Sequence, residues 1–428
     1  MKSLEIFSGA GGLAKGLEIA GADHSAFVEI NKNACETLRE NFEETKVFCG
    51  NIKDYDFSSV NNIDIVAGGP PCQPFSLGGK HKANQDSRDM FPYAINAIER
   101  LAPKAYVFEN VKGLLRPSFI DYFNYIILRL TFPECKPNLN MSWKEHLGIL
   151  NKLDYRSYNG IKYQVSYKLL NAADYGVPQC RERVVIVGIR SDLNLNWLFP
   201  TPTHSKEKLL CNMHITKEYW DYHKIPESQE EKVPHILNGH MLRLNTATEN
   251  GMRELKPWVT IRDALSDLPD PRCAHEIPDH VFRDGARIYP GHTGSIYDWP
   301  AKTIKAGAHG VPGGENMIRF PDGSVRYFTV FEAKRIQTFP DDFYIHGSWG
   351  EAMRQIGNAV PVLLALTIGR ELIHLLNKHI SDSDVKAKSS SRVQSIICSE
   401  RAMPKDENAI TTLNTYVRKS TSQHLSKA

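Results

Sequence analysis

The sequence predicts an α/β fold in which a mostly parallel, Rossmann-like sheet with an antiparallel last strand supports a smaller, loop-rich second domain. Two observations lead to this prediction. Up to residue 190, short apolar runs alternate with segments of helical apolar spacing, as in a parallel sheet covered by helices. From residue 191 to about 325, prolines, histidines and scattered aromatic residues replace the long periodic segments.

Seven apolar runs are predicted as the strands of the sheet. They are residues 4–8, 26–29, 46–49, 63–67, 105–108, 163–170 and 183–189. A short link joins the last two runs, which permits an antiparallel hairpin beside an otherwise parallel sheet. This hairpin weighs against a nicotinamide-dependent dehydrogenase.

Helices are predicted between the strands from apolar spacing and capping residues. Gly21 ends the first helix, Asn31 caps the second, and Asp86 or Ser87 caps the third. The polar, basic segment before the third helix, residues 77–88, is predicted to be a mobile lid. Further helices are predicted over residues 120–130, 143–153, 260–265 and 357–376.

Length and composition limit the class of protein. The 428 residues suffice for a large core, two domains and a tail, with a second domain expected over residues 191–325 and a poorly ordered tail over 381–428. The net charge of +3 is too small to identify a nucleic-acid partner by itself. Eight cysteines without Cys-x-x-Cys or zinc-like spacing predict free thiols in a reducing cytoplasm and no metal site. No signal peptide or run of membrane-spanning length is expected.

The glycine-rich turn Gly9-Ala10-Gly11-Gly12 follows the first predicted strand and opens the first helix. Glycine lets backbone amides approach a ligand, and a helix amino terminus favours negative charge, so this turn can hold a nucleotide-like ligand. The second strand ends in Glu29, about 20 residues later, where a carboxylate can accept hydrogen bonds from a ribose diol. Such turns also occur without a ligand in many α/β proteins.

Cys72 follows the fourth predicted strand, at the sheet edge where open α/β proteins bind ligands. Prolines on both sides restrict the backbone and donate no N–H, so they hold the thiol in one direction, as a nucleophile requires. A single cysteine on a turn is more often a buried structural residue. The residues that flank Cys72 favour the catalytic role.

The segment Pro70-Pro71-Cys72-Gln73-Pro74-Phe75-Ser76 resembles the catalytic motif of the DNA (cytosine-5) methyltransferases, in particular bacterial restriction-modification methylases. The resemblance extends from residue 3 to about 376, with the motifs in family order. It implies a methyltransferase fold in which a target-recognition domain (191–325) separates two parts of the catalytic and cofactor-binding domain (1–190 and 326–380). Further matching motifs are Phe7 to Gly12, Glu109-Asn110-Val111, Gln179-Cys180-Arg181-Glu182-Arg183 and Gly357 to Pro361.

The resemblance implies that S-adenosyl-L-methionine binds along the glycine turn and the neighbouring strand ends. The family usually has Gly-Asp-Ile after the third strand, whereas this chain has Gly50-Asn51-Ile52. An amide oxygen can still accept the hydrogen bond from adenine, so we expect weakened or rearranged binding there. The residues implied in cofactor binding are Phe7, Ser8, Gly9, Ala10, Gly11, Gly12, Glu29, Asn51, Ile52, Pro70, Asn358 and Val360.

The resemblance also implies the catalytic residues Cys72, Glu109 and Arg183. The Cys72 thiolate adds to C6 of cytosine, Glu109 holds N3 and the exocyclic amine, and Arg183 contacts O2. Carbon 5 then accepts the methyl group, and loss of its proton expels the thiolate. Because this carbon cannot be reached inside a duplex, the base must flip out.

Duplex DNA is the implied partner, and residues 191–325 are implied to recognise its sequence. Thr303-Ile304 matches a pair typical of that region in the family. We expect a monomer in the bacterial cytoplasm, associated with the nucleoid, with no metal or membrane and with a companion restriction endonuclease that forms no stable complex. The residues implied in DNA contacts are Gln73, Ser76, Lys80, Lys82, Ser87, Arg88, Gln179, Arg181, Lys302, Thr303, Ile304 and Lys305.

Two alternatives remain open. An RNA (tRNA) cytosine-5 methyltransferase of related sequence shares the Pro-Pro-Cys-Gln-Pro-Phe core, although the large region 191–325 favours duplex DNA. A non-catalytic DNA-binding paralogue is expected to have lost the nucleophile or the acid, and this chain keeps Cys72 and Glu109. The amino-acid sequence does not reveal which DNA sequence is recognised, because base contacts from a loop-rich domain follow no readable code.

Overall fold

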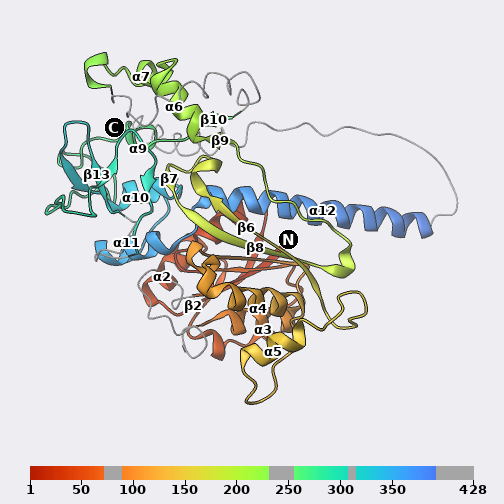
Figure 1. Cartoon of the computed structure of the whole chain (residues 1–428). Coiled ribbons are helices and arrows are strands. Elements are labelled where there is room, and N and C mark those ends of the chain that lie inside the picture. Colours follow the sequence, from red (N-terminus) through yellow and green to blue (C-terminus); the bar gives the residue numbers. More distant parts are fainter. Residues whose placement is uncertain (72–88, 231–254, 307–314, 392–428) are drawn as a thin grey trace.

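The computed structural model describes residues 1–71, 89–230, 255–306 and 315–391. Within these ranges, a seven-stranded main sheet has helices on both faces (Figure 1). Its strands are β1 (Lys2–Ile6), β2 (Asp23–Glu29), β3 (Lys46–Cys49), β4 (Ile65–Gly68), β5 (Ala105–Val111), β6 (Tyr163–Asn171) and β8 (Glu182–Arg190). The helices around it are α1 (Gly12–Ile19), α2 (Lys32–Asn41), α3 (Phe91–Leu101), α4 (Ile120–Thr131), α5 (Trp143–Leu150) and α12 (Val362–Ser391).

The strand order β3-β2-β1-β4-β5-β8-β6 confirms the predicted sheet. Neighbouring strands from β3 to β5 pair in parallel, whereas β8 runs antiparallel to both β5 and β6. Ile6 of β1 pairs with Gly68 of β4, and Gly68 pairs with Phe108 of β5. One edge of the sheet therefore carries three features: the glycine turn after β1, the loop that begins at Gly69 after β4, and Glu109 near the end of β5.

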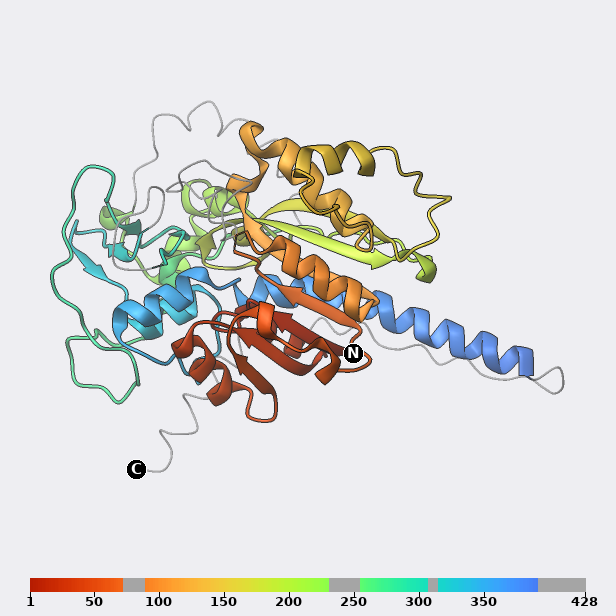
Figure 2. The same cartoon turned by 90° about the horizontal axis from the view of Figure 1, so that it is seen from below.

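Apolar side chains cover both faces of the central strands, as expected for a parallel sheet between helices. Val66 and Phe108 belong to the core that includes α3 and α4. Ala67 and Val107 belong to the core on the other face, which includes α1 and α12. Successive side chains of a strand point to opposite faces, so each strand contributes to both cores. Figure 2 shows α12 passing along the sheet and projecting beyond it.

Two glycines allow a close approach between α1 and the start of α12. A Cβ at Gly12 would lie 2.3 Å from the carbonyl oxygen of Val360. At Gly16 it would lie 2.4 Å from the Cβ of Ala365. Only glycine fits at these two positions without movement of the partner. The glycine turn is therefore fixed against the segment that contains Val360.

The capping predictions have different outcomes. Asn31 caps α2 as predicted, because its Oδ1 accepts the N–H of Ala34 at 2.9 Å. Helix α3 begins later than predicted, with Met90 at the cap position and no side-chain capping bond from it. The predicted caps of α3, Asp86 and Ser87, lie outside the described residues.

Apart from α12, the region after residue 190, with β7 (Gln179–Cys180) shortly before it, consists of short elements connected by loops. A parallel pair joins β12 to β7, the segment that leads into β8, and one apolar core contains Ile304 of this region together with Phe27 of β2. The predicted domain boundaries at 190 and 325 stay predictions. The elements are β7 (Gln179–Cys180), β9 (His204–Ser205), α6 (Lys206–His214), α7 (Glu218–His223), β10 (Lys256–Pro257), α9 (Ile261–Leu265), β11 (Ser295–Ile296), β12 (Ala301–Lys302), β13 (Met317–Arg319), β14 (Val325–Tyr327), α10 (Val330–Ile336) and α11 (Trp349–Asn358).

The stretch Trp349–His379 is long and apolar enough, by length and composition alone, to cross a membrane. The sequence analysis expected no such stretch. In its most apolar window, 72% is buried inside the protein, as in a core helix. Helix α12 also runs to Ser391, beyond the predicted end at residue 376.

Candidate active site

Glu109 and Arg183 meet near the carboxyl end of β5. Arg183 Nε lies 2.5 Å from Glu109 Oε1, and the two side chains are 12% and 11% exposed. The antiparallel register brings them together, because Val111 of β5 pairs with Arg183 of β8. The two atoms are in contact as an ion pair, but neither makes a hydrogen bond within the described protein. Both therefore retain hydrogen-bonding capacity for a ligand.

The loop that carries Cys72 starts beside this pair. A Cβ at Gly69, directly after β4, would lie 3.3 Å from Glu109 Oε2. Asn110 Nδ2 donates a buried hydrogen bond to the carbonyl oxygen of Pro70 at 3.0 Å. The start of the loop is thus fixed against the strand that carries Glu109. Cys72 itself lies outside the described residues.

Arg181 is fully buried next to the ion pair and is only partly hydrogen-bonded. Its Nη2 donates to the carbonyl oxygen of Gly357 at 2.7 Å, while Nε and Nη1 have no partner among the described residues. Burial lowers the pKa of Arg181 well below its usual range, Arg183 lowers it further, and Glu109 acts in the opposite direction. A buried guanidinium with two unused donors suits an acceptor ligand.

The turn between β1 and α1 has the left-handed backbone that favours its glycines, with φ of 54° at Gly9 and 80° at Gly11. A Cβ at Gly9 would meet no atom within 4 Å, so this side of the turn is open. Helix α1 starts without a side-chain cap, which leaves its first N–H groups available to another acceptor. The turn therefore fits a ligand that brings hydrogen-bond acceptors.

Glu29, at the end of β2, lies on the other side of this turn. Its Oε2 accepts the N–H of Gly9 at 2.8 Å, and its Oε1 accepts those of Ile30 at 2.9 Å and Asn31 at 2.7 Å. These bonds fix the carboxylate, which keeps further lone pairs for a diol. Ile30 is 65% exposed beside it, an apolar surface that the sequence analysis did not single out.

Asn51 follows β3, where the family motif has an aspartate. Its Oδ1 accepts the N–H of Lys53 at 3.1 Å and caps the short 3-10 helix η1 (Ile52–Asp54). The amide thus serves as a local cap, a role that aspartate fills equally well. The predicted contact between this side chain and adenine stays a prediction.

The other predicted cofactor residues lie at or behind the glycine turn. Phe7 has a positive φ of 56°, and Ser8 Oγ donates to the carbonyl oxygen of Glu5 at 3.0 Å. Asn358 is exposed at the end of α11. The remaining members of the set, Ala10, Ile52, Pro70 and Val360, are buried.

Glu5 is a buried carboxyl that the sequence analysis did not assign to the site. It lies in β1, is 1% exposed, and its Oε2 has no hydrogen-bond partner in the described part of the chain. Burial raises the pKa of Glu5 well above its usual range, a backbone hydrogen bond with Ala14 lowers it, and nearby Glu29 raises it. The signal in the sequence is a charged residue inside an apolar strand.

The predicted DNA-contact residues of the second region pack around β7. Lys302 Nζ lies 2.9 Å from Thr293 Oγ1, and Thr303 Oγ1 donates to the carbonyl oxygen of Cys180 at 2.9 Å. Burial lowers the pKa of Lys305, which is 8% exposed. Gln179, Arg181 and Ile304 are at most 1% exposed and contact other protein groups in this conformation. Their contacts with DNA stay predictions, and Gln73, Ser76, Lys80, Lys82, Ser87 and Arg88 lie outside the described residues.

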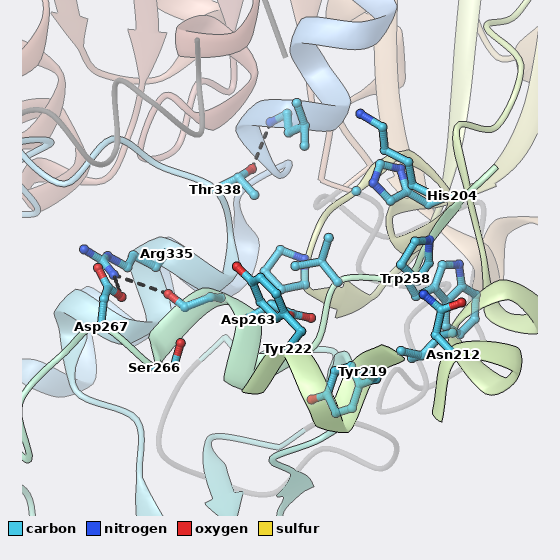
Figure 3. Close-up of a pocket in the computed structure, with 18 of the residues that line it drawn as sticks. His204, Asn212, Tyr219, Tyr222, Trp258, Asp263, Ser266, Asp267, Arg335 and Thr338 are labelled. Carbon is cyan, nitrogen blue, oxygen red and sulfur yellow. Dashed lines mark hydrogen bonds and ion pairs between the residues drawn. The ribbon is translucent and has the colours of Figure 1, made fainter. Parts of the chain in front are cut away.

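A cavity of about 920 Å³ lies elsewhere, between the second region and α10 (Figure 3). None of the predicted site residues lines it. Some polar groups in its wall are paired with the protein, since Trp258 Nε1 donates to Asp174 at 2.9 Å and Arg335 Nη1 donates to Asp267 at 2.6 Å. Asn212 Oδ1 in the same wall has no hydrogen-bond partner among the described residues. Because none of the predicted site residues lines the cavity, it is not the candidate active site. In the part of the chain that the structure describes, no three His, Cys, Asp or Glu side chains form a group that could hold a metal.

Comparison with known proteins identifies a family model and relatives that match most of the chain. The family model described as C-5 cytosine-specific DNA methylase matches residues 1–133 and 140–374. The Type II methyltransferase M.NgoMIV of Neisseria gonorrhoeae is 32% identical over 380 residues, which cover 88% of this chain and 98% of that protein. M.PspPI of Psychrobacter sp., another Type II methyltransferase, is 33% identical over 382 residues, or 87% of this chain and 79% of that protein.

Solved structures show the same fold at low sequence identity. The Dnmt2 methyltransferase of S. pombe is 18% identical, with a TM-score of 0.53, and the match covers 88% of this chain and 99% of that one. A putative DNA modification methyltransferase encoded within an E. coli prophage is 21% identical, with a TM-score of 0.51 and the same coverages. These likenesses extend to the architecture of the chain and no further.

Proposed function

The chain belongs to the C-5 cytosine-specific DNA methylase family, and we propose that it methylates a flipped-out cytosine in duplex DNA through a covalent Cys72 adduct. It is a DNA (cytosine-5) methyltransferase of the restriction-modification type and uses S-adenosyl-L-methionine. The observation that supports the proposed chemistry best is the meeting of Glu109, Arg183 and Pro70 at one edge of the sheet.

The proposed reaction begins at C6 of the cytosine, because C5 is a poor nucleophile until another nucleophile has added to C6. The Cys72 thiolate forms a bond to C6, and negative charge develops towards N3 and O2. Glu109 gives a proton to N3 and accepts a hydrogen bond from the exocyclic amine, and Arg183 donates to O2, so both offset that charge. Their buried ion pair keeps the two groups in place before the base arrives. The N3 proton returns to Glu109 when the thiolate later leaves.

S-adenosyl-L-methionine supplies an electrophilic methyl group to the activated carbon. Loss of the C5 proton to a base then returns the electron pair that breaks the bond between C6 and the Cys72 sulfur. The thiolate leaves, and 5-methylcytosine is released. The thiol therefore ends the cycle in the state in which it began.

The residues around the glycine turn fit this cofactor. The open side of Gly9 and the uncapped start of α1 would accept its amino-acid part, and Glu29 would accept hydrogen bonds from its ribose. Exposed Ile30 offers an apolar surface for a ring. Asn51 would accept from the adenine amino group in place of the family's aspartate.

Recognition of DNA is proposed for residues 191–325, with base contacts near Thr303. The target base must leave the duplex to reach Cys72, at a cost of a few kcal/mol. We further propose that the protein acts as a monomer in the bacterial cytoplasm and protects DNA from a companion endonuclease. The Type II relatives support this setting by name.

A covalent trap tests the adduct directly. Bisulfite sequencing of DNA from expressing cells first identifies the target site. A duplex with 5-fluorocytosine at that site is expected to trap the protein, because fluorine cannot leave as a proton does. Cys72→Ser should form no adduct and lose methyl transfer by orders of magnitude, while it retains sequence-specific DNA binding.

The control is Cys273→Ser, which changes an exposed cysteine far from the family motifs and should behave as the normal protein. Near-normal methylation by Cys72→Ser, or an adduct that maps to Cys180, would contradict the mechanism. Competition between tRNA and duplex DNA as substrates tests the RNA alternative. A DNA methyltransferase should methylate the duplex and leave the tRNA unmethylated.

A further inference from the structure

Two buried glutamines connect three segments that are distant in the sequence. Gln179 Oε1 accepts the N–H of Ile304 at 2.9 Å, and Gln179 Nε2 donates to Gln337 Oε1 at 3.0 Å. Gln337 Nε2 donates to the carbonyl oxygens of Ile356 at 2.6 Å and Ala359 at 3.3 Å. Both glutamines are 0% exposed. We call this chain of hydrogen bonds the amide relay.

The direction of the relay is fixed by the backbone at its two ends. At one end a donor, the N–H of Ile304, requires the oxygen of Gln179. At the other end two carbonyl oxygens require the nitrogen of Gln337. The remaining Gln179 nitrogen and Gln337 oxygen then face each other as donor and acceptor. Only two amides of this orientation satisfy every group, since a carboxylate has no donor and an apolar side chain has neither group.

Each end of the relay is next to a part of the proposed active site. Lys305 follows Ile304 directly, and a Cβ at Gly357 would lie 2.4 Å from the Lys305 carbonyl group, so the two segments touch. Arg181 Nη2 donates to the carbonyl oxygen of Gly357 at 2.7 Å. Gln179 itself lies four residues before Arg183 on the segment that enters β8. The relay therefore connects three segments: residues 301–305, which we call the recognition segment, the strand that carries Arg183, and residues 356–360, which contact the glycine turn at Gly12.

We propose that Gln179 and Gln337 are positioning residues that fix the recognition segment 301–305 relative to Arg183, so that target reading and catalysis share one geometry. This inference rests on the proposed function. Among the described residues, the Gln337 side chain makes no hydrogen bond to segment 301–305, Glu109 or Arg183, and it acts through Gln179. Ile304 provides the contact on the other side.

Hydrogen exchange tests the relay without reference to activity. In the full-length protein, Gln179→Met and Gln337→Met keep side-chain length but remove the amide. Both are expected to increase exchange in segment 301–305 about tenfold, the scale of one buried hydrogen bond left unmade. The result for Gln337→Met is decisive, because that side chain makes no hydrogen bond to Ile304 and is linked to it through Gln179. Unchanged exchange there in a folded variant would overturn the proposal.

Target discrimination provides the functional measurement. It is the ratio of kcat/KM on the target duplex to kcat/KM on duplexes with one altered base pair. Each variant is expected to lower this ratio about tenfold, and the double variant to lower it little further, because both changes break one chain of bonds. Additive losses would show two separate roles and would overturn the relay.

Gln355→Met is the matched control. Gln355 is also a buried glutamine with two hydrogen bonds, since its Oε1 accepts from Thr37 at 2.7 Å and its Nε2 donates to the His346 carbonyl oxygen at 2.7 Å. It should lose comparable thermal stability with unchanged discrimination and unchanged exchange in segment 301–305. An equal effect from this control would show that the relay variants act through a general loss of stability. That result would overturn the positioning role of the relay. Absence of methylation in the normal protein would refute the proposed function instead, and the exchange measurement would still test the relay.

Discussion

Glu5 places an ionisable carboxyl inside β1, where the main sheet and α1 exclude water. Burial raises its pKa well above the ordinary value of 4.5, despite the hydrogen bond with the Ala14 backbone. The raised pKa means that the folded protein retains this proton at pH values at which the unfolded chain has lost it. The free energy of unfolding therefore falls, by about 1.4 kcal/mol for each pH unit, between the unfolded and the folded pKa.

Glu5→Gln should remove this pH dependence, because glutamine keeps the shape and carries no charge. The stability that the protonated carboxyl provides is complete below pH 4.5 and is lost as the pH rises through the folded pKa. We expect the stability of the variant relative to the normal protein to increase as the pH rises above 4.5, by at most about 1.4 kcal/mol for each pH unit, measured by urea unfolding. Glu40→Gln, on the exposed side of α2, controls for loss of a surface carboxylate. A difference that stays constant with pH would contradict the burial argument.

Among the elements, α1 and α12 define the back of the glycine turn, where the cofactor is proposed to bind. Their close approach depends on glycine, since a Cβ at Gly16 would lie 2.6 Å from the backbone nitrogen of Leu366 and 2.6 Å from the carbonyl oxygen of Val362. Backbone atoms cannot move aside as the end of a flexible side chain can. Movement of α12 would also displace Val360 from Gly12, and thereby change the turn.

Gly16→Ala should therefore destabilise the protein by about 1–3 kcal/mol, the usual cost of overpacking a core. Binding of S-adenosyl-L-methionine should weaken in the same variant, as measured by calorimetry. Gly148→Ala in α5 is the matched helical control, because its Cβ would meet no atom within 4 Å. That control should be neutral or more stable by up to about 1 kcal/mol, since alanine favours the helix. Equal stability of the two variants would show that α1 and α12 can separate without cost.

At the scale of the whole molecule, the proposed recognition region, residues 191–325, and the main sheet with its helices are not independent bodies. Ile261, Ile304 and Ile318 share one apolar core with Ala14 and Phe27. The β12–β7 pair adds backbone hydrogen bonding across the same boundary. A transplanted recognition region must therefore preserve this shared core and the relay, as well as its own loops.

Grafting residues 191–325 from a Type II relative with a known target should transfer that target to this protein. The reason is that base contacts are proposed for this region, while Glu109 and Arg183 lie on the main sheet. The core positions Ile261, Ile304 and Ile318 should stay as they are here. Bisulfite sequencing of DNA from expressing cells provides the measurement. An active chimera that methylates the original sequence would show that recognition resides elsewhere.

Local patterns in the sequence were sufficient to predict the main sheet, its antiparallel strand and the family motifs. Strands buried on both faces appear as short continuous apolar runs, and residues such as Gly9 and Asn31 act through their own backbone or first helical turn. Glu29 was also predictable, because its position depends on one strand and one turn. The family resemblance then supplied the roles proposed for Cys72, Glu109 and Arg183.

Only the tertiary structure decided which side chains meet. Gln179 and Gln337 are 158 residues apart in the chain, and no periodicity links them. The burial of Glu5 and Ile304 depends on elements that pack from distant parts of the sequence. The contact between Arg183 and Glu109 requires the antiparallel register of β8 on β5. The physical reason is that a sequence pattern indicates which side chains of one segment are buried and which face water. A site is formed by several segments, and their relative positions are set by packing.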